Sequence, residues 1–152
     1  MKKKILGILI IITMFLITGC STKDTMSADA FKNKMEKKGF AVSDQTSLAK
    51  GTNSSVEKSY IATKTDMTYA IEYYSFDGEI SAQAFYAQKR DYFAGIGASA
   101  NTEVTAGNYS KYANTFNGKY GVISKVSNTA IYVNADNIYE EEIKSILKDI
   151  GY

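Results

Sequence analysis

The sequence contains no histidine, no proline and no tryptophan, and Cys20 is its only cysteine. Without histidine, the chain cannot form a Ser-His-Asp triad or supply imidazole ligands to a metal. With one cysteine, it cannot form an internal disulfide or a multi-thiolate zinc or iron–sulfur site. The fold must therefore be stabilised by packing, and we expect no cofactor and no metal site.

The chain does contain a pattern typical of a secretory signal at its start. Three lysines, Lys2 to Lys4, precede an apolar run over residues 5–17, and the stretch ends in Ile17-Thr18-Gly19-Cys20. A bilayer-spanning helix needs about 20 apolar residues, so this run is too short for a permanent membrane span. A basic start, a short apolar core and small residues before a cleavage point indicate a signal peptide that is removed.

The end of this signal resembles the lipobox of bacterial lipoproteins. The resemblance implies that a signal peptidase recognises Ile17, Thr18 and Gly19 and removes residues 1–19. It also implies that Cys20 carries a diacylglyceryl group and acyl chains such as palmitate, and is the first mature residue. The protein would then be anchored on the extracytoplasmic face of the cell membrane. An ordinary signal peptide with an incidental cysteine is the alternative.

The remaining chain is long enough for one domain and is close to electrically neutral. The signal holds three of the 18 basic residues and none of the 16 acidic ones, which leaves residues 20–152 with a net charge of −1. This balance gives no electrostatic reason to expect nucleic acid as a partner. We expect the lipidated cysteine and a short tether over residues 20–26, which spans about 20 Å at most, and a single domain over residues 27–152.

Hydrophobic periodicity predicts three helices and up to seven strands in that domain. The helices are expected from Ser27 to about Lys38, over about fifteen residues from Ser81, and from Asn137 to Ile150, where Asn137 and Glu140 match a capping box. The residues between 43 and 55 are rich in Ser, Thr, Asn and Gly and are expected to form a mobile loop. The expected strands are 40–45, 56–64, 67–76, 102–106, 109–116, 119–126 and 129–134.

This order predicts an α+β fold, an antiparallel sheet with helices packed on one of its faces. The segment Ser27-Ala28-Asp29-Ala30-Phe31 recurs as Ser81-Ala82-Gln83-Ala84-Phe85, which raises the hypothesis of a tandem repeat of a helix-plus-strands unit. The arrangement resembles the tandem helix-plus-sheet units of β-lactamase inhibitor proteins in architecture only. The whole chain, with its Ile-Gly-Tyr ending, is similar to the small lipoproteins of low-GC Gram-positive bacteria.

Two surfaces are candidates for binding. Strand alternation places Tyr60, Tyr74 and Tyr132 on the outer face of the sheet, with Ile61, Ile131 and Val133 inside. An exposed tyrosine face would suit recognition, whereas the alternative is that these are ordinary strand residues. The first helix carries Lys32, Lys34, Lys37 and Lys38, which form either a solvated surface or a basic patch that faces anionic lipid or wall polymer.

The expected function is a lipid-anchored binding or interaction module, inhibitory or protective, rather than an enzyme. Its partner would be an envelope protein or a wall polymer. The alternative is a carboxylate-dependent hydrolase of wall glycan, which requires two carboxylates about 5–10 Å apart in a cleft. The candidates for such a pair are Glu72, Asp77, Glu79, Asp91 and Glu103.

Overall fold

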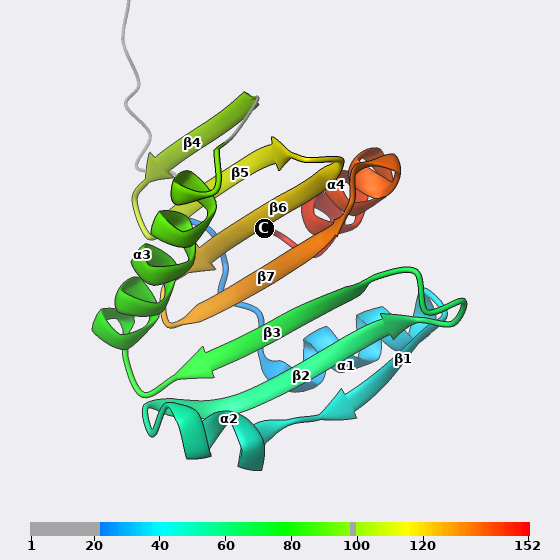
Figure 1. Cartoon of the computed structure of the whole chain (residues 1–152). Coiled ribbons are helices and arrows are strands. Elements are labelled where there is room, and N and C mark those ends of the chain that lie inside the picture. Colours follow the sequence, from blue (N-terminus) through cyan, green and yellow to red (C-terminus); the bar gives the residue numbers. More distant parts are fainter. Residues whose placement is uncertain (1–21, 98–99) are drawn as a thin grey trace, which may run out of the picture.

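The computed structural model describes residues 22–97 and 100–152, and the lipobox lies outside these ranges. Within them the protein is an α+β domain built on one seven-stranded antiparallel sheet, in the order β1-β2-β3-β7-β6-β5-β4 (Figure 1). The strands are β1 (Phe40–Asp44), β2 (Val56–Lys64), β3 (Ala70–Phe76), β4 (Ala100–Ala106), β5 (Tyr109–Phe116), β6 (Lys119–Val126) and β7 (Thr129–Asp136). The predicted fold class and antiparallel sheet are confirmed.

Four α-helices in the described ranges cover both faces of this sheet. α1 (Ala28–Lys37) and α4 (Glu140–Asp149) pack on one face, and α2 (Thr46–Thr52) and α3 (Glu79–Gly95) on the other (Figure 1). The prediction that all helices share one face is therefore wrong. The two faces of β3 contact different helix layers: Ile71 and Tyr73 belong to the core beneath α1 and α4, whereas Phe76 belongs to the core beneath α3.

Turn chemistry fixes the pairing of the central strands. Asn117 and Gly118 have φ values of 45° and 75° between β5 and β6, as a two-residue hairpin turn requires. The next hairpin turns at Ser127, whose φ is 49°. β5 and β6 therefore pair in register from Tyr109↔Val126 to Phe116↔Lys119, with the bounds that the sequence predicts.

Three helix starts differ from the sequence expectations. α2 occupies the segment expected to be a mobile loop, and the Asp44 carboxylate accepts a 2.8 Å hydrogen bond from the Thr46 amide at its start. α3 begins at Glu79, before Ser81, whose hydroxyl instead donates to Asp77. The predicted capping box does not form, because residues 137–139 make a 3₁₀ turn and no side chain caps α4.

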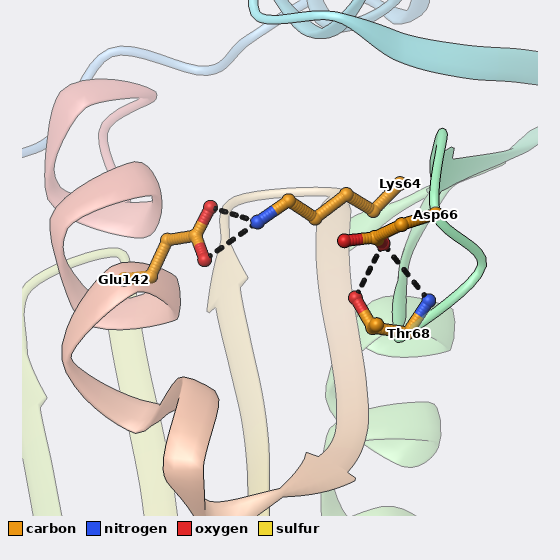
Figure 2. Close-up of polar contacts among 4 residues, drawn as sticks. All are labelled: Lys64, Asp66, Thr68 and Glu142. Carbon is orange, nitrogen blue, oxygen red and sulfur yellow. Dashed lines mark hydrogen bonds and ion pairs between the residues drawn. The ribbon is translucent and has the colours of Figure 1, made fainter.

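An ion pair joins the helix layer to one end of the sheet. Lys64, the last residue of β2, donates to both carboxylate oxygens of Glu142 in α4 at 2.6 and 2.8 Å (Figure 2). In the adjacent turn, Asp66 accepts hydrogen bonds from the amide and the hydroxyl of Thr68 (Figure 2). We call this the β2–β3 turn end of the sheet. The opposite end carries the β4–β5 and β6–β7 turns.

The strand order is compatible with the hypothesis of a tandem repeat. From each edge inward, the strands follow the chain order, β1-β2-β3 on one side and β4-β5-β6 on the other, with β7 between the two sets. β3 and β6 are both antiparallel to β7 and therefore parallel to each other. A two-fold rotation about an axis parallel to the strands would superpose one set on the other. The same rotation exchanges the two faces of the sheet, which agrees with the positions of α1 and α3 on opposite faces.

No helix in residues 22–97 and 100–152 is long and apolar enough to cross a membrane.

Candidate functional site

A groove between α2 and α3 is the strongest candidate site. Its floor is formed by β2 and β3, and the hollow has a volume of about 460 Å³, which is within the range of ligand-binding clefts. Leu48 of α2 stands on one wall with 70% of its surface exposed. Phe85, Gln88 and Lys89 of α3 form the opposite wall. We call this hollow the α2–α3 groove.

The floor of the groove is apolar and aromatic. Ile61 of β2 and Tyr74 of β3 line it and are half-buried. Tyr74 packs against Phe85, with ring centroids 4.7 Å apart, and donates its hydroxyl to Glu72 at 2.5 Å. Burial and this carboxylate acceptor raise the pKa of Tyr74, so the hydroxyl stays protonated and acts as a hydrogen-bond donor at neutral pH.

A positively charged side chain, Lys89, lies beside this floor. The ammonium of Lys89 lies 4.7 Å from the ring centroid of Tyr132 and 5.5 Å from that of Phe85. Lys89 lines the groove, and none of the described residues that line it is acidic. The groove therefore presents apolar surface next to a positive charge, which suits an apolar ligand that carries an anionic group.

The structure separates the three tyrosines of the predicted outer face. Tyr74 and Tyr132 share the face of α2 and α3, where both are half-buried, and Tyr132 stacks on Phe93 at 5.4 Å. Tyr60 lies on the other face and is 7% exposed, within the core that includes α1. The assignment of Tyr60 to the outside and Ile61 to the core is therefore wrong, whereas Ile131 and Val133 are buried as expected.

Two of the four lysines of the predicted basic patch pair with acidic neighbours. Lys32 pairs with Glu36 at 3.9 Å, and Lys38 pairs with Asp149 of α4 at 2.6 Å. The Lys34 ammonium donates to the backbone carbonyl of Asp149 at 3.4 Å. These contacts favour a solvated surface tied to α4 over a free basic patch.

The predicted tether is bound to the domain over most of its length. The side chain of Asn108 accepts a hydrogen bond from the Lys23 amide at 2.9 Å and donates to the Lys23 carbonyl at 2.8 Å. Met26 is 8% exposed, and its carbonyl accepts a 2.7 Å hydrogen bond from the buried Tyr73 hydroxyl. We call residues 22–26 the N-terminal strap.

Four of the five candidate carboxylates contact neighbouring side chains. Glu72 accepts from Tyr74, and Asp77 accepts from Ser81. Asp91 and Glu103 both contact the guanidinium of Arg90, at 2.8 and 3.6 Å, and Glu79 lies in the first turn of α3. Residues 22–97 and 100–152 contain no cluster of acidic side chains able to hold a metal ion.

Sequence reasoning missed most of the groove. Leu48 is the one feature of the sequence that could have indicated the groove, because it is a large apolar residue within a polar segment expected to be a loop. Ile61 and Lys89 carried no such signal, because their role depends on how α2 and α3 meet over β2.

Comparison with known proteins gives no family for this chain. No protein-family model matches it, and no curated protein matches it at significant similarity. Among solved structures, it is similar to a GTP binding regulator from Thermotoga maritima, with 20% identity and a TM-score of 0.47 over 80% of this chain and 84% of that one. A likeness this distant does not extend to function.

Proposed function

We propose that the protein is a lipid-anchored, extracytoplasmic binding module that recognises an envelope protein through the α2–α3 groove. The lipobox-like sequence from Ile17 to Cys20 supports the anchor, and the chemistry of the groove supports the binding role. The partner would insert an apolar side chain into the groove and place a carboxylate near Lys89.

The main support for this proposal is that exposed apolar side chains lie together in one hollow. They are not scattered one by one over a convex surface. Leu48, Ile61 and Phe85 come from three different elements and line the same groove. A partner that covers such a surface displaces water from it, and the binding free energy becomes more favourable by about 25 cal/mol per Å² of apolar area covered. The aliphatic side chains of Leu48 and Ile61 suit a protein side chain better than a glycan, although the lining also includes the polar residues Gln45, Thr52, Asn53, Ser59 and Gln88.

The groove lends no support to glycan hydrolysis. Its lining contains no carboxylate among the described residues, whereas a glycosidase places two on either side of the scissile bond. Glu72, beside the groove, is already engaged by the Tyr74 hydroxyl.

Site-specific photocrosslinking on intact cells tests the groove. A photoreactive phenylalanine analogue replaces Leu48, and in the control chain it replaces Ile138, which is 77% exposed but does not line the groove. We expect one discrete protein adduct from position 48 and none from position 138. Equal labelling from the two positions would mean that the groove is an ordinary surface.

Charge reversal separates specific binding from chance contact. In the Leu48 crosslinking background, Lys89→Glu should reduce the adduct by about tenfold, because an anionic group on the partner would meet a negative charge. Lys50→Glu is the matched control, since it makes the same charge change on exposed α2 without lining the groove. If the adduct is released by wall-degrading enzymes rather than by protease, the partner is a wall polymer and the proposed partner class is wrong.

A further inference from the structure

The N-terminal strap is positioned between the proposed anchor and the domain. Thr22 is the first described residue and lies two positions after Cys20. Two residues span about 7 Å when fully extended, so a lipid on Cys20 must enter the bilayer close to where the strap begins. Lys23, the next residue, is held at the β4–β5 turn by Asn108.

Three contacts bind the strap along its length. Both backbone hydrogen-bonding groups of Lys23 pair with the Asn108 side chain, and the Lys23 ammonium lies 3.5 Å from the ring centroid of Tyr109. Asn108 also donates to the Ser127 hydroxyl, which fixes the rotamer that receives the strap. At the other end of the strap, Tyr73 holds the Met26 carbonyl in a buried position.

We propose that the strap is a rigid mount that makes the β4–β5 and β6–β7 turn end of the sheet the membrane-facing surface of the lipid-anchored domain. The inference rests on the proposed anchor at Cys20 and replaces the idea of a free tether. The strap lies on the face of α1 and α4, because Met26 and Tyr73 belong to that core. The α2–α3 groove is on the opposite face and stays open to a partner.

The same geometry places the lysines of the first helix unevenly. Lys34 lines a hollow together with Thr22 and Lys23 of the strap, so it lies near the proposed anchor. Lys37 and Lys38 come shortly before Phe40, which pairs with Lys64 at the β2–β3 turn end. The Lys38 ammonium pairs with Asp149 at 2.6 Å, so its charge is partly neutralised.

Hydrogen exchange tests the strap itself and does not depend on lipidation. In the full-length protein purified in detergent, the Lys23 amide should exchange about tenfold more slowly than in Asn108→Ala, where its acceptor is missing. Asn128→Ala is the matched control, because that side chain donates to the Phe76 carbonyl and not to the strap. Tyr73→Phe is a second probe that should release Met26 while the ring packing remains. Equal exchange at Lys23 in all four proteins would overturn the proposal.

Fluorescence quenching tests the orientation. Acylation consumes the only native thiol, so an introduced cysteine can carry a unique fluorophore. The label is placed at Thr105, beside the β4–β5 turn, or at Met67, in the β2–β3 turn. The proteins are then placed in nanodiscs of phosphatidylethanolamine and phosphatidylglycerol that carry a headgroup quencher.

We expect at least about threefold stronger quenching at position 105 than at position 67, and Asn108→Ala should reduce the difference because a released strap adds about 17 Å of free chain. Equal quenching at the two positions in the wild-type background would contradict the fixed orientation even if the Lys23 amide is protected. A protein that carries no lipid and does not enter nanodiscs would instead contradict the anchor. The orientation inference would then fail with it, whatever the exchange experiment shows.

Discussion

At the scale of single residues, Gly121 shows how closely α3 packs on the sheet. A Cβ atom at this position would lie 2.4 Å from Cε1 of the Phe93 ring, and Phe93 is fully buried. The ring also stacks on Tyr132 and contacts Phe116, so it has little room to move. The absence of a side chain at position 121 is therefore what allows α3 to approach β6.

Gly121→Ala should lower the free energy of unfolding by about 1–3 kcal/mol, as overpacking of a core does. Gly51→Ala is the matched control, because nothing lies within 4 Å of its added Cβ and α2 gains a better helix former. Urea unfolding followed by circular dichroism measures both. A loss at position 51 as large as that at position 121 would show that the Phe93 contact does not limit the packing.

The error over Tyr60 also belongs to the residue scale. Lys58, Tyr60 and Lys64 do share one face of β2, as alternation predicts, and that face is the one covered by α1. The two lysines stay half-exposed or exposed because they lie at the strand ends, and Lys64 reaches Glu142. Charged residues at the ends of a strand therefore do not indicate which of its faces is buried. The buried face depends on which side of the sheet the helix covers.

At the scale of elements, the sequence predicts the apolar face of α4 correctly, although not its start. Its stripe of Ile143, Ile146, Leu147 and Ile150 is buried as expected, because one strongly apolar face leaves a single way to pack. α2 could not be predicted in the same way. It is seven residues long, contains Gly51, and depends on tertiary contacts such as Ala49 against the core beneath α3. Short helices of this kind have little intrinsic stability.

Truncation in α4 tests its packing. Leu147 is fully buried, so Leu147→Ala should reduce the free energy of unfolding by about 2–5 kcal/mol. Ser145→Ala, on the exposed side of the same helix, should change it by less than about 0.5 kcal/mol. A loss below about 0.5 kcal/mol at position 147, in the same urea titration, would show that α4 does not pack on the sheet as described.

At the scale of the whole molecule, the sequence predicts the α+β class and most strand bounds, but not the placement of helices on both faces. Local patterns determine which residues alternate, whereas the distribution of helices between faces depends on crossovers that no local pattern encodes. The α2–α3 groove follows from that placement, since it lies where α2 and α3 cover the same face incompletely. The strap is also a product of tertiary structure, because Lys23 and Asn108 are 85 positions apart.

The proposed mount and the proposed position of the groove outside the membrane both depend on a lipid anchor at Cys20. Intact-mass spectrometry of the protein from the membrane fraction tests it most directly, with Cys20→Ala as the control. We predict the mass of residues 20–152 plus a diacylglyceryl group, and for Cys20→Ala the loss of this species, with uncleaved or released protein in its place. A wild-type protein with an unmodified Cys20, or a Cys20→Ala protein that remains in the membrane at the normal processed size, would contradict the lipid anchor.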